Sequence, residues 1–201
     1  MKERSKVELA HRIQLSWMRF HKHCDLLLDK NLNIHSRLKF FQSVISSTLL
    51  YGLAACALTA RQLQSLDILQ RKMLRRIVGW RRVDGEDWCE TMRRMRTRVD
   101  SALSSQPVED WSKQLLRRQF RMVCRMSTRS DEWAMRVSLW NPALTHVNAY
   151  RGRGRPAACW DDRMNEFVRA KLNVANWHEA CTHPDFPWYE EVFVQFHSDG
   201  V

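Results

Sequence analysis

The sequence has no apolar run that approaches the roughly 20 residues a helix needs to cross a bilayer. It also lacks a secretory signal peptide, and the acids Glu3 and Glu8 in its basic N-terminal stretch argue against a transit peptide. The six cysteines therefore indicate thiols in a reducing compartment. These absences predict an intracellular protein of the nucleus or cytoplasm that is not secreted and has no membrane partner.

Motifs for metal binding are also scarce. Structural zinc sites usually combine closely spaced pairs of ligands, such as Cys-x₂₋₄-Cys. No such cysteine pair occurs in the sequence. Suitable ligand atoms are carried by Cys159, His178, Cys181 and His183. Without the paired spacing, we expect neither a metal ion nor another cofactor.

A catalytic centre is missing as well. Nucleotidyl transfer needs two carboxylates that hold two divalent ions about 4 Å apart. The adjacent acids Asp161 and Asp162 follow Trp160 rather than the apolar strand that would present such a pair. A Ser-His-Asp elbow and a phosphate-binding glycine loop are also lacking. We therefore expect no catalytic residues and no catalysis by this chain alone.

No segment shows a convincing strand-like alternation of apolar and polar residues. Apolar residues instead recur at steps of three and four, which is the spacing of one face of a helix. The sequence therefore predicts an all-α fold, a multi-helix bundle with a less regular helical C-terminal extension. The expected helices cover 3–28, two segments of 38–78 divided near Gly52, 86–100, 108–126, 132–140, 160–172, 177–181 and 188–196, with a linker over 101–107.

Periodic apolar residues define the expected core. The first helix should bury a continuous seam formed by Val7, Ala10, Ile13, Trp17, Phe20, Cys24 and Leu27. The two helices of 38–78 should pack through ridges formed by Leu38, Phe41, Ile45 and Leu49 and by Leu63, Leu66, Met73 and Ile77. Thr59 is a suitable N-cap for the second of these helices, Gly79 marks its end, and only Ile68 falls on its wrong face.

Two helices carry rows of basic residues opposite their apolar faces. The first cationic ridge comprises Arg61, Arg71, Lys72, Arg75 and Arg76. The second cationic ridge comprises Lys113, Arg117, Arg118, Arg121 and Arg125. Guanidinium groups on a rigid helix can contact phosphates bidentately and release counterions. Because few acids are interspersed in these ridges, we favour phosphate contact over an ordinary solvated helix face.

Two loops add further arginines. Arg81 and Arg82 follow Trp80, the tryptophan best placed to stack on a base, whereas most of the nine Trp side chains should pack in the core. Arginines alternate with glycines over 151–156, as in a flexible RNA-contacting arm, and a charged linker is the alternative. These arginines are Arg151, Arg153 and Arg155.

Charge is distributed unevenly along the chain. Residues 1–160 hold 30 basic and 14 acidic side chains, a net charge of +16, whereas residues 161–201 hold 3 and 8, a net charge of −5. A basic body favours nucleic acid as its partner ahead of a membrane. We expect three segments: a helical bundle over 1–100, a basic helix with an arginine-glycine loop over 101–158, and an acidic helical extension over 159–201.

Four short motifs occur in a fixed order: Leu49-Leu50-Tyr51-Gly52 with Leu58-Thr59, then Leu74-Arg75-Arg76-Ile77-Val78-Gly79, Gly154-Arg155-Pro156 and Trp160-Asp161. They resemble the segments that follow the polymerase palm in non-LTR (LINE-type) retrotransposon reverse transcriptases. The resemblance implies a thumb over 1–100 that grips RNA or an RNA–DNA hybrid through its backbone. It also implies that the catalytic acids belong to a palm and fingers that this chain lacks, and which would be its protein partner.

Three positions depart from the family pattern. Ser47 and Cys56 stand where the family commonly has proline and tryptophan, and Arg121-Met122 replaces Gly-His. The sequence therefore leaves open an inactive remnant of such an element. A helical protein-interaction module, whose basic face would meet an acidic protein, is a further alternative.

Overall fold

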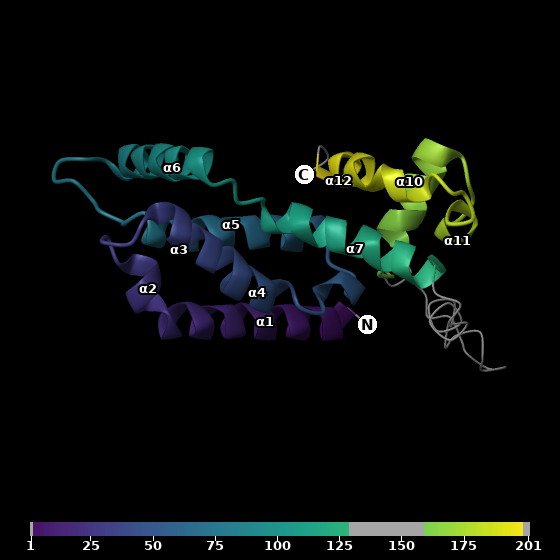
Figure 1. Ribbon diagram of the computed structural model, residues 1–201, viewed down its shortest axis with the longest axis horizontal. Coiled ribbons are helices and arrows are strands. Elements are labelled where there is room, and N and C mark those ends of the chain that lie inside the picture. The colour runs from purple at the N-terminus through teal and green to yellow at the C-terminus, as the bar shows by residue number, and fades with distance from the viewer. Residues whose placement is uncertain (1, 129–158, 199–201) are drawn as a thin grey trace. The chain divides into compact units, whose positions relative to one another are not determined.

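The computed structural model describes residues 2–128 and 159–198 (Figure 1). Helices form all of the regular secondary structure in these two ranges, without any strand, and the all-α prediction is confirmed. The helix expected over 132–140 lies outside the described residues, and so do Arg151, Arg153 and Arg155. Among the described helices, none is long and apolar enough to cross a bilayer.

Contacts between residues group the chain into two compact units. The N-terminal unit comprises Glu3–Leu53 and Leu58–Leu115, and the C-terminal unit comprises Ala54–Ala57 and the described residues of Leu116–Gly200. Helix α7 (Trp111–Thr128) begins in the first unit and continues in the second. The three segments expected from charge and resemblance stay a prediction, because these units do not report which segments fold separately.

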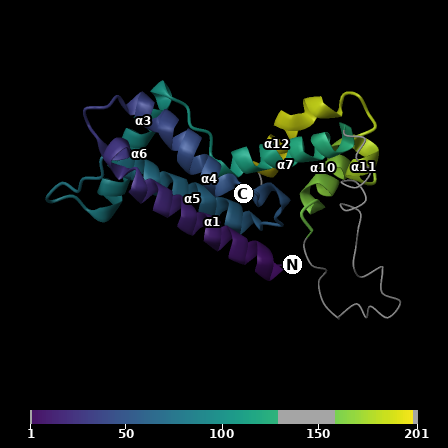
Figure 2. The same cartoon turned by 60° about the horizontal axis from the view of Figure 1, so that its bottom comes forward.

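Two helices, α1 (Lys2–Lys22) and α2 (Cys24–Leu28), replace the single helix expected over 3–28. The chain turns at His23, whose backbone N–H is shared between the carbonyls of Arg19 and Phe20. Figures 1 and 2 both show α1 running alongside helix α5 (Ala60–Ile77). The turn at His23 therefore ends α1 and lets α2 take a new direction.

The apolar seam predicted for the first helix is wrong at its N-terminal end. Val7 is 67% exposed, and Ala10 is also exposed. The buried residues of α1 and α2 are Leu9, Ser16, Phe20 and Leu27. Ser16 can occupy the interior because its hydroxyl donates to the Ile13 carbonyl at 2.8 Å, which satisfies a polar group that apolar periodicity ignores.

The first helix of the central pair comprises α3 (Ile34–Phe40), a π-helical turn (Phe41–Ser46) and α4 (Ser47–Leu50). Its predicted ridge is confirmed, because all four side chains are buried: Leu38, Phe41, Ile45 and Leu49. The π-helical turn also buries Ser46, whose hydroxyl accepts a hydrogen bond from Trp111 Nε1 at 2.7 Å. After α4, Gly52 adopts a φ of +73° and leads into a 3₁₀ turn (Leu53–Ala55).

Helix α5 forms the second half of this pair, and its predicted ridge of Leu63, Leu66, Met73 and Ile77 is buried. Thr59 caps the helix as predicted, in a capping box with Gln62. Gly79 follows the last turn with a φ of +89°, a conformation that favours glycine. Ile68 is 61% exposed, as expected for its position on the opposite face.

Side chains of α5 also cap the start of α7. Asp67 accepts hydrogen bonds from the backbone N–H and the hydroxyl of Ser112, at 2.9 and 2.6 Å. Gln70 accepts one from the Trp111 N–H at 3.1 Å. The first N–H groups of a helix have no partner within the helix. These contacts therefore fix where α7 begins against α5.

Helix α6 (Trp88–Ser105) extends past its expected end at residue 100, so the linker prediction is wrong for 101–105. Met95 and Val99 are buried, and Ala102 and Leu103 are half-buried on the turns that follow. The apolar face thus continues beyond the arginine-rich part of the helix. The small polar residues of 101–105 had suggested a linker, but packing outweighs their weak preference against helix.

The C-terminal unit adds helices α10 (Asp162–Leu172), α11 (Trp177–Ala180) and α12 (Glu190–Ser198), with a 3₁₀ turn (Phe186–Tyr189). These match closely the helices predicted over 160–172, 177–181 and 188–196. Phe120 of α7 lies 5.1 Å from Phe186 and 5.4 Å from Phe193 between ring centroids, and Phe167 meets Phe193 edge-on at 5.3 Å. This phenylalanine cluster is the core of the unit.

Candidate nucleic-acid interface

A cleft of about 530 Å³ lies between α5 and α6 and is lined mainly by arginines. We call it the arginine cleft; its residues are Arg71, Arg75, Met92, Arg93, Arg96 and Val99. Helix α5 supplies the first two, and α6 supplies the others. Four guanidinium groups therefore line a depression with an apolar base, within the N-terminal unit.

Only weak ion pairing opposes these charges in the described part of the cleft. Asp100 lies 3.9 Å from a guanidinium nitrogen of Arg71 and 3.9 Å from one of Arg96, with about half of its own side chain exposed. Exposed pairs at such distances contribute little to stability. Burial, and then the charge of Arg71, lowers the pKa of Arg75. The cleft therefore carries a surplus of positive charge that an anion could neutralise.

The structure divides the first cationic ridge between two environments. Arg71 and Arg75 line the arginine cleft. Arg76 and Lys72 lie over the ring of Trp17 in α1, at 4.9 and 5.8 Å from its centroid. The fifth member, Arg61, is exposed in the first turn of α5. The ridge is thus not a single row, although four of its members cluster along the C-terminal half of α5.

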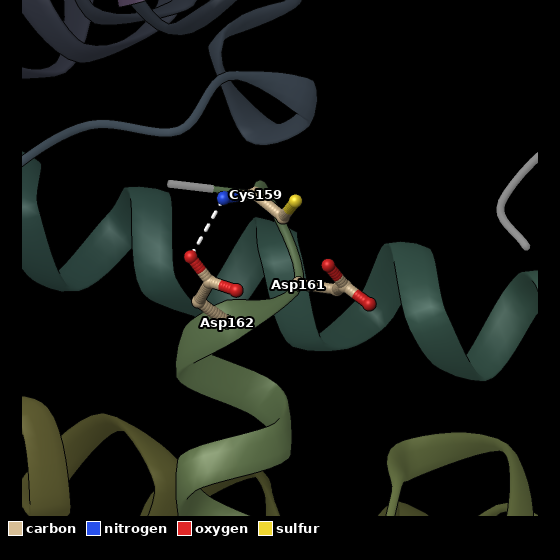
Figure 3. Close-up of side chains that lie close together, drawn as sticks. All are labelled: Cys159, Asp161 and Asp162. Carbon is tan, nitrogen blue, oxygen red and sulfur yellow. Dashed lines mark hydrogen bonds between the residues drawn. The ribbon is translucent and has the colours of Figure 1, made fainter. Parts of the chain in front are cut away.

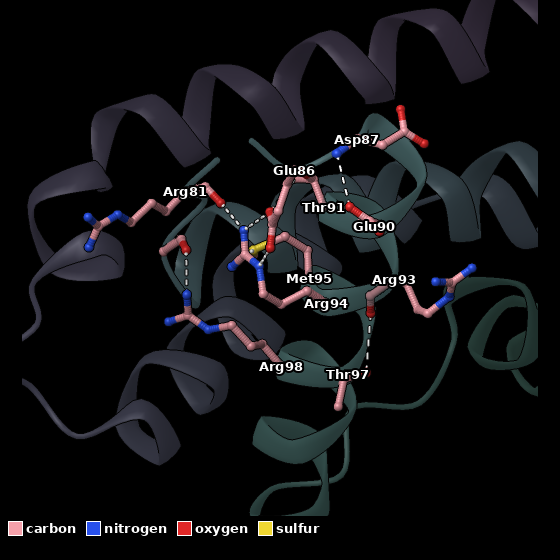
Figure 4. Close-up of polar contacts among 11 residues, drawn as sticks. Arg81, Glu86, Asp87, Glu90, Thr91, Arg93, Arg94, Met95, Thr97 and Arg98 are labelled. Carbon is pink, nitrogen blue, oxygen red and sulfur yellow. Dashed lines mark hydrogen bonds and ion pairs between the residues drawn. The ribbon is translucent and has the colours of Figure 1, made fainter. Parts of the chain in front are cut away.

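The sequence did not single out Arg93 and Arg96. Arginines of α6 had been attributed to a preference for basic residues late in a helix, yet the helix continues well beyond them. Figure 4 shows Arg93 directed away from the network around Arg94. Their spacing of three positions on one helix face was the available signal. What periodicity could not reveal was that this face meets α5.

The other arginines of α6 hold the loop that joins it to α5. Arg94 donates to both carboxylate oxygens of Glu86, at 2.6 and 2.8 Å, and to the backbone carbonyl of Arg81 at 2.6 Å (Figure 4). These bonds lower the pKa of Glu86 to about 2. Arg98 donates to the carbonyls of Val78 and Gly79. The side chains of Arg81 and Arg82, both predicted to bind nucleic acid, are exposed on this loop.

The second cationic ridge is not open, which corrects the expectation that few acids oppose it. Arg117 forms ion pairs with Glu190 and Glu191 of α12, and Arg121 binds Glu190 at 2.8 Å. Arg118 is half-buried, and burial lowers its pKa. The opposing acids lie about 70 positions later in the chain, where helical spacing gives no hint of them. Lys113 and Arg125 remain exposed.

One group of three potential metal ligands occurs within the described ranges: Cys159, Asp161 and Asp162, with ligand atoms within 4.8 Å of one another (Figure 3). Asp162 already accepts from the Cys159 backbone N–H at 2.6 Å, and Asp161 accepts from the Trp177 indole N–H at 3.1 Å. Burial, together with the two carboxylates, raises the pKa of the Cys159 thiol and so disfavours a metal-binding thiolate. These contacts anchor the start of α10, and we assign no metal to them.

Comparison with known proteins gave no match to any family, curated protein or solved structure.

Proposed function

We propose that this chain binds the backbone of RNA or an RNA–DNA hybrid without sequence preference, as the post-palm region of a LINE-type reverse transcriptase. The arginine cleft is the observation that carries the proposal. The motif resemblance supplies the expected partners, a template–primer duplex and a separate palm with fingers. The protein would act in the nucleus or cytoplasm and contribute no catalytic group of its own.

The chemistry of the cleft supports backbone binding. A guanidinium group can donate two parallel hydrogen bonds to one phosphate, and Arg is suited to this because its donors form a rigid planar fork. Arg71 and Arg75 come from one helix and Arg93 and Arg96 from another, so the four donors face one depression from two sides. Such contacts do not read bases, and they give affinity that is independent of sequence.

The proposal can be tested with two variants of equal net charge. The first replaces the four cleft arginines: Arg71→Gln, Arg75→Gln, Arg93→Gln and Arg96→Gln. The second replaces four exposed lysines outside the cleft: Lys6→Gln, Lys22→Gln, Lys30→Gln and Lys39→Gln. Binding of a labelled RNA–DNA hybrid would be measured by fluorescence anisotropy, with circular dichroism to check that both variants remain helical.

We expect the cleft variant to bind all hybrid sequences at least about tenfold more weakly, and the lysine variant to lose much less. Equal losses would show that total charge, rather than the cleft, drives binding, and would contradict the proposal. Competition by unstructured polyanions with no preference for duplexes would instead favour an acidic protein as the partner.

The family origin has its own test in the DNA immediately upstream of the coding region. An open or broken frame that encodes Ala-Asp-Asp after an apolar run would support derivation from a reverse transcriptase. The absence of any such frame would contradict it, without bearing on whether the cleft binds nucleic acid.

A further inference from the structure

Two exposed tryptophans lie next to the arginine cleft. Trp80 follows α5 and is 42% exposed, and Trp88 is the first residue of α6 and is 57% exposed. Their ring centroids are 5.9 Å apart, with the ring planes inclined by 53°. Tryptophan has the largest apolar surface of any side chain, so packing alone would favour burying both rings. Their exposure leaves ring faces available to another molecule.

The two rings line a pocket of about 350 Å³, which we call the tryptophan pocket. The remaining lining residues are Lys72, Arg75, Arg76 and Met92. Arg75 and Met92 also line the arginine cleft, so the pocket and the cleft adjoin. An aromatic surface thus continues a cationic one, within a single compact unit.

The backbone around Trp80 is held on both sides. Arg98 donates to the Gly79 carbonyl at 3.3 Å, and Arg94 donates to the Arg81 carbonyl at 2.6 Å. Trp88 is fixed at the start of α6, where Asp87 and Glu90 form a capping box. Because both rings are anchored through α6, a ligand that stacks on them would lose little affinity to ordering the loop.

The lining chemistry identifies the occupant. Three cationic side chains would repel a quaternary ammonium ligand, which aromatic cages otherwise bind. An anion with a flat π-face would use both the rings and the cations. A nucleotide has this combination, because its base can stack on tryptophan while its flanking phosphates meet arginine and lysine.

We propose that the tryptophan pocket stacks an unpaired base of a strand whose duplex portion lies in the arginine cleft. This inference rests on the proposed function, and it adds a preference for junctions between duplex and single strand. Stacking does not discriminate among bases, so the preference is for an unpaired end of any sequence.

The test compares a blunt RNA–DNA hybrid with the same hybrid carrying a short single-stranded overhang. The wild-type chain should bind the overhang hybrid about tenfold more tightly, as expected for one stacked base. Trp80→Leu and Trp88→Leu should each remove most of this advantage and leave blunt binding unchanged, whereas Trp80→Phe should retain part of it. Trp188→Leu is the matched control, because Trp188 is 83% exposed in the C-terminal unit.

The outcomes separate this inference from the proposed function. Salt-dependent blunt binding without an overhang advantage, or an advantage that survives both leucine variants, would overturn base stacking and leave the cleft intact. Failure to bind the blunt hybrid, with single-strand binding that Trp80→Leu abolishes, would contradict the cleft and support the pocket. Displacement of the overhang hybrid by polyglutamate as readily as by an oligonucleotide of equal charge would also overturn base stacking.

Discussion

At the scale of single residues, buried polar side chains fix how the helices of the N-terminal unit meet. Ser46 and Gln70 are each 1% exposed, and both bind Trp111 at the start of α7. Gln70 also donates to the Glu109 carbonyl at 3.0 Å. Buried polar groups are costly unless they are paired, so these contacts strongly favour one register. Apolar periodicity located the helices but gave no sign of this network.

The Trp111–Ser46 bond leads to a stability prediction. In Trp111→Phe the Ser46 hydroxyl loses its indole donor while most of the apolar contact is kept, so the free energy of unfolding should fall by about 1–3 kcal/mol. Urea unfolding followed by circular dichroism would measure the change. Trp188→Phe, on an 83% exposed residue, should stay within about 0.5 kcal/mol of wild type. Equal effects of the two variants would argue against the buried bond.

At the scale of helices, α7 and α12 are joined by arginine–glutamate pairs. Glu190 lies between Arg117 and Arg121, and its side chain is 21% exposed, whereas that of Glu191 is 75% exposed. Hydrogen bonds from Arg121, and then from Arg117, lower the pKa of Glu190. We infer that Glu190 contributes most of the stabilisation, since exposed pairs are screened by water.

This difference leads to a pH-dependent prediction. A carboxyl with a lowered folded-state pKa stabilises the fold at pH values above its ordinary pKa, about 4.3, and the gain is lost as pH falls through the folded-state value. Glu190→Gln should therefore lower the free energy of unfolding by about 1–2 kcal/mol at pH 7, and the gap should shrink below about pH 4. Glu191→Gln should change it by less than about 0.5 kcal/mol.

Thermal unfolding of both variants at pH 7 and pH 3.5 would check this prediction. A destabilisation by Glu190→Gln that is the same at both pH values would indicate lost packing rather than a lost charge.

The sequence predicted the helices better than it predicted their partners. The ridges of α4 and α5 and the Thr59 cap follow from local spacing, which one helix specifies by itself. The pairing of Arg117 with Glu190 depends on residues 73 positions apart, and the arginine cleft depends on which face of α6 meets α5. Such contacts are set by tertiary packing, so Arg93 and Arg96 were missed and the second cationic ridge was assigned too much exposed charge.

At the scale of the whole molecule, the uneven charge of the sequence has a local use. Acids of the negative segment 161–201 bind partners inside the C-terminal unit, where Glu190 and Glu191 bind arginines and Asp161 and Asp162 anchor α10. In the N-terminal unit, the arginine cleft has only Asp100 at the limit of ion pairing among its described contacts. We therefore expect the cleft, rather than the second cationic ridge, to provide the main binding surface.

The salt dependence of hybrid binding tests this account most directly. Four phosphates neutralised by Arg71, Arg75, Arg93 and Arg96 predict a slope of roughly −3 to −4 for the logarithm of the association constant against the logarithm of salt concentration. Replacing all four with Gln should bring the slope close to zero, while the four-lysine variant should keep most of it. A flat wild-type plot, or a cleft variant with the wild-type slope, would contradict the claim that this cleft holds a nucleic-acid backbone.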